Sequence, residues 1–115
     1  MGNILVTGAE GFIGQRLVEI LESNGNPVLQ LGRTGGDIAD PATLKPFHDA
    51  PVDFVFHLAG KTYVPDSWRE PASFQYVNVM GATNVLELCR KKKIPLIYVS
   101  AYLYGIPASL PVKES

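Results

Sequence analysis

The stretch TGAEGFIG, residues 7–14, sets three glycines, Gly8, Gly11 and Gly14, at intervals of three. It follows the apolar run NILVT (3–7), which is typical of a buried strand, and it opens a segment with helical periodicity. In that context Gly8 permits a tight turn, Gly11 lets the backbone approach a pyrophosphate, and Gly14 lets the helix pack closely. Amide groups at the helix start would face the phosphates. The pattern predicts a dinucleotide-binding turn, and a glycine-rich turn without a ligand is the alternative.

Helices and strands alternate along the rest of the chain. The turn leads into a predicted helix that ends at NGN (24–26), with an apolar stripe formed by Ile13, Leu17, Ile20 and Leu21. Further strands are predicted at 27–32, 52–60 and 95–100, with a short helix interrupted by Pro46 between the first two of these. A long helix is predicted over 66–92, and its apolar face carries Phe74, Val77, Gly81, Val85 and Leu88.

This alternation predicts an α/β fold with a Rossmann-type parallel sheet, right-handed crossovers and helices on both faces. Four strands are about two-thirds of the usual six, so we expect the sheet to be truncated after the fourth strand. The edge left there would favour association with another chain, and we expect a homodimer.

The composition favours a small-molecule partner. Ten basic and eleven acidic residues give a net charge of -1, which argues against partners such as nucleic acid or an anionic membrane. The apolar run at 4–6 is too short for a signal peptide or a membrane span. The single cysteine, Cys89, suits a reducing compartment, so we expect a cytoplasmic protein. No metal site is predicted.

The end of the second predicted strand bears on the choice of cofactor. The dinucleotide fingerprint places an acidic residue there to hold the ribose hydroxyls, but this chain has Gly32, followed by Arg33. A guanidinium can grip a ribose 2′-phosphate with two parallel hydrogen bonds. We therefore expect NADP or NAD, with NADP favoured, and a solvated role for Arg33 is the alternative.

Five motifs, taken in order and spacing, resemble the first half of an extended short-chain dehydrogenase/reductase, and most closely the nucleotide-sugar epimerases, dehydratases and reductases. They are TGAEGFIG (7–14), GDIAD (36–40), HLAG (57–60), YVNVMGATNVLELC (76–89) and YVSAYLYG (98–105). The resemblance implies that residues 1–115 are the N-terminal part of an NAD(P)-binding domain whose substrate domain lies outside this chain. It also implies a nicotinamide cofactor and a nucleotide-sugar substrate as partners.

The resemblance assigns roles to individual residues. Cofactor binding falls to Gly8, Glu10, Gly11, Phe12, Ile13, Gly14, Arg33, Asp37, Ile38, Leu58, Ala59, Gly60 and Asn78. The substrate side falls to Lys61, Thr62 and Tyr102. Ser100 matches the catalytic serine or threonine, which hydrogen-bonds the substrate oxygen at the carbon where hydride leaves or arrives.

Plainer structural roles are open for several of these positions. Asp37 could cap a turn or helix, Asn78 could be an ordinary polar helix residue, and Ser100 could cap a strand. We interpret His57 as a packed strand residue and the basic run 91–93 as a solvated helix end.

The family's general acid/base is a tyrosine activated by a lysine four positions later, and none of the five tyrosines has a lysine at that spacing. We therefore expect the chain itself to be inactive and its parent protein to act by hydride transfer at a sugar carbon. A non-catalytic NAD(P)-sensing module and a reductase of another carbonyl substrate are the alternatives.

Overall fold

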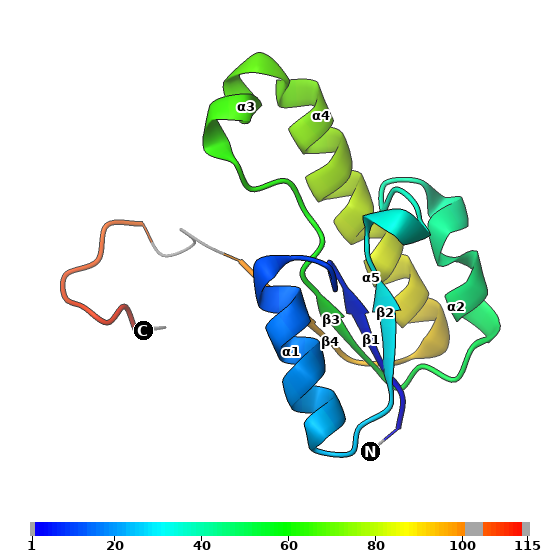
Figure 1. Ribbon diagram of the computed structural model, residues 1–115. Coiled ribbons are helices and arrows are strands. Elements are labelled where there is room, and N and C mark those ends of the chain that lie inside the picture. Colours follow the sequence, from blue (N-terminus) through cyan, green and yellow to red (C-terminus); the bar gives the residue numbers. More distant parts are fainter. Residues whose placement is uncertain (1, 101–104, 114–115) are drawn as a thin grey trace.

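Four parallel strands form the centre of the computed structural model, which describes residues 2–100 and 105–113 (Figure 1). In chain order they are β1 (Ile4–Thr7), β2 (Val28–Leu31), β3 (Phe54–His57) and β4 (Leu96–Tyr98). Their order in the sheet is β2-β1-β3-β4, and every neighbouring pair is parallel. The α/β fold with a parallel sheet is confirmed, although each strand is shorter than its predicted run.

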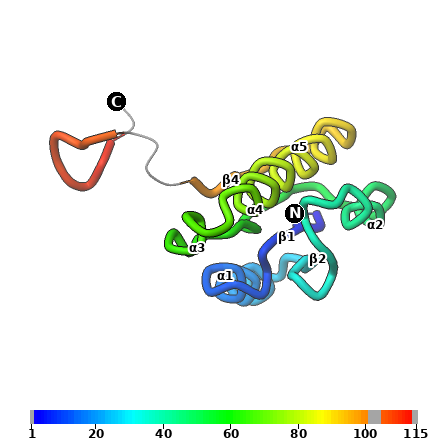
Figure 2. The backbone as a smooth tube through the Cα atoms, turned by 90° about the horizontal axis from the view of Figure 1, so that it is seen from above, coloured from blue at the N-terminus to red at the C-terminus, as the bar shows by residue number. Residues whose placement is uncertain are grey.

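Helices cover both faces of the sheet, as predicted. Helix α1 (Phe12–Ser23) lies on one face, whereas α2 (Lys45–Asp49) and α5 (Gly81–Lys92) lie on the other (Figure 2). The remaining elements are short: η1 (Arg33–Gly35), η2 (Pro41–Leu44), α3 (Val64–Arg69), α4 (Pro71–Gln75) and η3 (Tyr76–Met80). Helix α3 and the start of α4 extend beyond the carboxyl ends of the strands (Figure 1).

Each face of the sheet has its own apolar core. Beneath α1 the buried residues are Ile4, Val6, Ala9 and Val18. The larger core on the opposite face joins strand residues such as Leu5 and Val55 to Val85, Leu88 and Cys89 of α5. Side chains alternate between the two cores along β1, as the two-residue period of a strand requires. The sheet is therefore a fixed platform for the loops at its carboxyl ends.

The predicted apolar stripe of α1 is partly wrong. Ile13 and Ile20 are 59% and 44% exposed, whereas the buried positions of the helix are Gly14 and Val18. The cause is the contact between the helix and the glycine turn, because a Cβ added to Gly14 would overlap the carbonyl oxygen of Gly8. This contact sets the rotation of α1 and turns Ile13 and Ile20 outward.

The single long helix predicted over 66–92 is also wrong in detail. The chain breaks at Glu70, with φ -132° and ψ 57°, because the ring of the following Pro71 disfavours helical geometry at the preceding residue. Beyond the break, α4 runs into the π-helical turn η3 and then α5. The buried face of α5 at Gly81, Val85 and Leu88 is confirmed.

Among residues 2–100 and 105–113, no helix combines the length and the apolar character needed to cross a lipid bilayer.

Candidate cofactor-binding site

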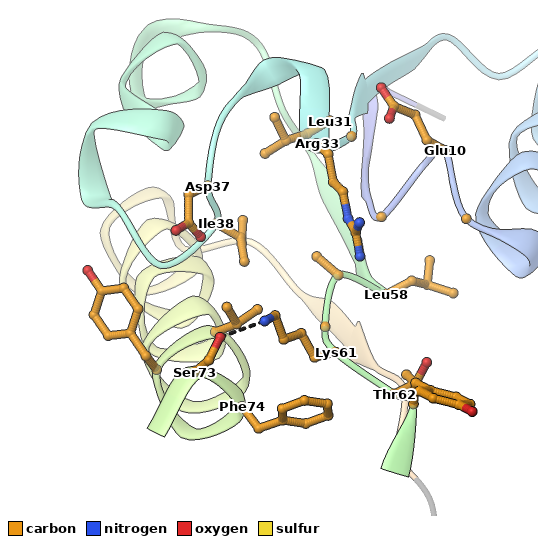
Figure 3. Close-up of a pocket in the computed structure, with 18 of the residues that line it drawn as sticks. Glu10, Leu31, Arg33, Asp37, Ile38, Leu58, Lys61, Thr62, Ser73 and Phe74 are labelled. Carbon is orange, nitrogen blue, oxygen red and sulfur yellow. Dashed lines mark hydrogen bonds between the residues drawn. The ribbon is translucent and has the colours of Figure 1, made fainter. Parts of the chain in front are cut away.

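A cavity of about 960 Å³ opens where β1, β2 and β3 end and their loops begin (Figure 3). Many of its lining residues were predicted from the sequence: Gly8, Glu10, Gly11, Arg33, Asp37, Ile38, Leu58, Ala59, Gly60, Lys61 and Thr62. Others were not predicted: Leu31, Gly32, Gly36, Tyr63, Asp66, Ser73, Phe74, Tyr76 and Val77. Ligands of open parallel sheets bind at this end of the strands.

The glycine turn forms one wall of the cavity. Gly8 has φ +68°, a conformation that residues with a Cβ rarely adopt, and an added Cβ would lie 2.8 Å from the amide nitrogen of Ala59. The turn is closed by a hydrogen bond from the Gly11 amide to the Gly8 carbonyl at 3.1 Å. Gly8 therefore allows the backbone of the turn to lie directly against the loop that follows β3.

Helix α1 begins beside this turn. Gly11 is its N-cap residue, and no side chain caps the helix there. The amides of the first turn, including those of Phe12 and Ile13, have no acceptor within the helix. The side chain of Phe12 is 97% exposed and does not line the cavity. Any contact of Phe12 and Ile13 with a ligand in the cavity would therefore come from their backbone amides, which suit an anionic group.

The hydroxyl of Thr7 fixes the start of the β3 loop. Its Oγ1 accepts hydrogen bonds from the amides of Leu58 at 3.1 Å and Ala59 at 3.2 Å, and it lies 2.7 Å from Nδ1 of His57. Because the hydroxyl accepts from both amides, its own hydrogen points to the imidazole. His57 is buried, and desolvation lowers its pKa from 6.5 to about 4, so the ring is neutral at pH 7. The interpretation of His57 as a packed strand residue fits this geometry.

The loop that carries Asp37 and Ile38 is firmly held. The Asp37 carboxylate accepts from the Ala39 amide at 2.9 Å, and the Asp37 carbonyl accepts from the Thr43 hydroxyl at 2.6 Å. The side-chain amide of Asn84 donates to the carbonyls of Ile38 and Ala39, each at 3.0 Å. The Asp37 side chain therefore caps a turn, which was the alternative role considered for it, and Asp37 also lines the cavity.

Arg33 follows Gly32 at the end of β2, and its guanidinium is directed into the cavity toward Leu58 (Figure 3). No ion pair within residues 2–100 and 105–113 involves Arg33. The cavity therefore contains a cation that can engage an anionic ligand.

Lys61 forms the opposite wall. Its ammonium lies 2.5 Å from the Ser73 hydroxyl, 3.7 Å from the Glu70 carboxylate and 5.5 Å from the centre of the Phe74 ring. Figure 3 shows the bond between Lys61 and Ser73. Ser73 and Phe74 precede Val77 by four and three residues, so all three lie on one helix face. This helical spacing could have identified Ser73 and Phe74 as neighbours of the site.

Asn78 lies behind this wall and does not line the cavity. Its Oδ1 accepts from the Lys61 amide at 2.7 Å, and its Nδ2 donates to the Lys61 carbonyl at 3.0 Å. Asn78 thus pairs with both backbone groups of one loop residue. This geometry supports an ordering role for Asn78 in the loop that follows β3.

The predicted catalytic residue does not line the cavity. Ser100 follows β4, is exposed and is not among the lining residues. Tyr102 falls outside the described residues. The roles of Ser100 and Tyr102 stay predictions.

The parallel sheet, the glycine turn and the cavity at the carboxyl ends of the strands define a Rossmann-type fold of the dinucleotide-binding class. The chain belongs to the NAD dependent epimerase/dehydratase family, whose model matches residues 4–115.

Known relatives agree with this membership. The chain is 32% identical to the GDP-6-deoxy-D-mannose reductase of Pseudomonas aeruginosa, and the match covers 96% of this chain and 38% of the relative. Among solved structures, it is 31% identical to UDP-glucose 4-epimerase from Brucella ovis in complex with NAD, with a TM-score of 0.84 over 99% of this chain and 40% of that one. It is 32% identical to RMD from Pseudomonas aeruginosa complexed with NADPH, with a TM-score of 0.76 over 99% of this chain and 41% of that one. The chain therefore spans about two-fifths of the length of these proteins.

Proposed function

We propose that residues 1–115 form the NAD(P)-binding part of a nucleotide-sugar epimerase, dehydratase or reductase, with the substrate domain outside this chain. The observation that carries the proposal is the convergence of three loops on one cavity: the glycine turn, the loop after β2 and the loop after β3. The names of the relatives support it, since one structure holds NAD and another NADPH.

The residues of the cavity fit a dinucleotide in chemical terms. The backbone of the glycine turn and the first amides of α1 suit the pyrophosphate. The resemblance to the family implies that the adenine lies at the loop of Asp37 and Ile38, which also lines the cavity. Leu58, Ala59 and Gly60 would flank the ribose and phosphates. A nicotinamide cofactor supplies hydride transfer at a sugar carbon, and the residues of this chain bind and orient it.

Calorimetric titration of the pure chain with NAD and NADP tests the proposal. Gly11→Val places a branched side chain on the cavity wall, where an added Cβ lies 3.3 Å from the Gly8 carbonyl oxygen, and thermal unfolding of the variant checks that the fold is kept. Glu22→Val is the matched control, because it adds the same side chain to an exposed position of α1 away from the cavity. We expect Gly11→Val to weaken binding sharply and Glu22→Val to leave it unchanged. Equal binding by both variants would contradict the assignment.

For the cofactor we propose NADP or NAD, with NADP favoured by Arg33. The direction of its guanidinium into the cavity supports this preference (Figure 3). Arg33→Ala should weaken NADP binding more than NAD binding, because only NADP carries a 2′-phosphate. An equal loss for the two cofactors would argue against a role at the 2′-position.

We propose that the parent protein transfers hydride at a sugar carbon and that Ser100 hydrogen-bonds the reacting oxygen. Residues 1–115 contain no tyrosine followed by lysine four positions later, which supports binding without turnover in this chain alone. The alternatives are an NAD(P)-sensing module and a reductase of another carbonyl compound. Assays of the parent protein separate them: Ser100→Ala should lower turnover of a nucleotide sugar far more than cofactor binding, whereas a sensing module would bind cofactor and turn over neither substrate class.

We also propose a homodimer in the cytoplasm. β4 borders an edge of the sheet, and its Ile97 and Tyr98 and the following Val99 are exposed apolar or aromatic residues that association would cover. Cys89 is a buried free thiol, in keeping with a reducing compartment. Light scattering over a concentration series tests the dimer, and a monodisperse monomer at all concentrations would refute it.

A further inference from the structure

Glu10 lies where a side chain at the end of β2 would otherwise extend. A Cβ added to Gly32 would overlap Cδ, Cγ and Oε1 of Glu10. The Glu10 carboxylate therefore occupies the space above the first residue after β2, although Glu10 belongs to the glycine turn. Figure 3 shows this carboxylate beside the loop that begins after Leu31, and it shows Arg33 extending from the same loop toward Leu58.

The position of this carboxylate is fixed by a hydrogen bond. The hydroxyl of Thr34, in η1, donates to Oε1 of Glu10 at 2.5 Å. A carboxylate has about four acceptor positions on its two oxygens, so one donor leaves Oε2 able to accept further hydrogen bonds. Glu10 is also one of the residues that line the cavity. It can thus accept hydrogen bonds from a ligand without leaving Thr34.

The usual dinucleotide fingerprint requires a carboxylate at this place. There an acidic residue at the end of the second strand accepts from the ribose hydroxyls of NAD, and its charge disfavours a 2′-phosphate. Position 32 of this chain is glycine and cannot supply it. The absence of a side chain at Gly32 is also what gives Glu10 room.

We propose that Glu10, held by Thr34 over Gly32, is a specificity-determining residue that accepts the ribose hydroxyls of NAD in place of the missing acidic residue. This inference rests on the proposed binding of NAD(P). Glu10 and Arg33 then act in opposite directions at the same ribose: the carboxylate favours the 2′-hydroxyl, and the guanidinium favours the 2′-phosphate. The chain accepts both cofactors, and the balance between these two side chains sets their ratio.

Moving the carboxylate tests the proposal directly, with Kd values for NAD and NADP from calorimetry on the whole chain. Glu10→Ala should weaken NAD binding about tenfold, the usual effect of losing a hydrogen bond to a charged acceptor, and should strengthen NADP binding. The double variant Glu10→Ala/Gly32→Asp returns a carboxylate from the strand end and should restore NAD binding. Glu10→Ala/Gly32→Asn is the matched control, since asparagine has the same shape without the charge, and it should fail to restore NAD selectivity.

Thr34 provides an independent check on the positioning. Thr34→Val removes the hydroxyl that holds Glu10 and should shift the ratio of the two Kd values in the same direction as Glu10→Ala, whereas Thr34→Ser should leave it unchanged. Thermal unfolding of each variant confirms that the fold is kept.

The outcomes separate this inference from the proposed function. Binding of both cofactors with an unchanged Kd ratio in Glu10→Ala overturns the role of Glu10 and leaves the NAD(P) site standing. If Glu10→Ala/Gly32→Asp does not recover NAD affinity, Glu10 does not replace the acidic residue that is missing at position 32, and the proposal is overturned. A parent chain that binds neither NAD nor NADP overturns the proposed function and this inference together.

Discussion

Gly81 and Ile38 approach each other so closely that a Cβ on Gly81 would lie 2.7 Å from Cγ2 of Ile38. Gly81 is the first residue of α5, and Ile38 lies in the loop that lines the cavity. Both are buried. The glycine therefore brings the helix against the loop after β2. One face of α5 thus supports the wall of the candidate site.

Because of this contact, we predict that Gly81→Ala lowers the free energy of unfolding when residue 38 is isoleucine and raises it when residue 38 is alanine. In the parent chain the added methyl group overpacks Ile38, at a cost of about 1–3 kcal/mol that exceeds the gain of about 1 kcal/mol in helix propensity. In an Ile38→Ala background the space is open, so the same change should raise the free energy of unfolding by about 1 kcal/mol. Urea unfolding of the four chains measures the coupling, and additive effects would contradict the contact.

The buried pair of Thr7 and His57 predicts a specific pH dependence of stability. Desolvation lowers the pKa of His57 from 6.5 in the unfolded chain to about 4 in the folded one. Above pH 6.5 the ring is neutral in both states. As the pH falls from 6.5 toward 4, only the unfolded chain takes up the proton, so the free energy of unfolding decreases by about 3 kcal/mol in total, and the loss levels off below pH 4.

His57→Asn separates this effect from the titration of carboxylates. The asparagine oxygen can accept from the Thr7 hydroxyl in place of Nδ1, but the residue does not titrate. Over the range from pH 6.5 to 4, stability measured by urea unfolding should fall less steeply in His57→Asn than in the parent. Parallel curves for the two chains would show that the folded protein accepts the proton on His57 without penalty.

Asn78 and Lys61 predict a difference in hydrogen exchange. Asn78→Ala leaves both backbone groups of Lys61 without their partner, at a cost of about 1–2 kcal/mol, and the Lys61 amide should exchange faster. Asn78→Asp keeps an acceptor for that amide but loses the donor to the Lys61 carbonyl, so it should retain slow exchange at Lys61 while losing stability. Site-resolved hydrogen exchange measures the Lys61 amide in both variants. Identical rates in Asn78→Ala and Asn78→Asp would argue against the hydrogen bond between the Lys61 amide and the side chain of residue 78.

Lys93, the C-cap residue that follows α5, has the left-handed conformation, with φ +56° and ψ +45°. This conformation costs a residue with a Cβ about 1–2 kcal/mol, whereas glycine adopts it freely but has more freedom in the unfolded chain. Lys93→Gly should therefore raise the free energy of unfolding by about 0.5–1 kcal/mol. Lys91→Gly, within the last helical turn, is the control and should lower it by about 1 kcal/mol. A decrease for both variants, measured by thermal unfolding, would contradict the role of the left-handed cap.

The sequence predicted those features that depend on local pattern. Alternating strands and helices, a glycine turn and a missing acidic residue at position 32 can all be read from residue types and spacing. They led to the parallel sheet and to Gly8, Gly11 and Arg33 at the cavity, whereas the other lining residues that were predicted came from the resemblance to the family. The face of α5 was predicted because Gly81, Val85 and Leu88 keep a regular helical period.

The remaining features depend on contacts between distant segments. The rotation of α1 is set by the contact of Gly14 with the carbonyl of Gly8. The periodicity of apolar residues in the sequence does not reveal this contact. The basic run 91–93 at the end of α5 was interpreted as solvated, yet the ammonium of Lys92 donates to the carbonyls of His48 at 3.0 Å and Ala50 at 2.9 Å. Glu10 was assigned to the cofactor, but its place over Gly32 appears only in three dimensions.

The π-helical turn η3 changes the direction in which side chains point between α4, before it, and α5, after it. A turn with hydrogen bonds from i to i+5 holds roughly one residue more than an α-helical turn, and each residue of an α-helix advances the side-chain direction by about 100°. This offset lets Asn78 face the loop of Lys61 while Val85 and Leu88 face the core. A chain shortened by one residue in this turn could align the contacts before it or those after it, but not both.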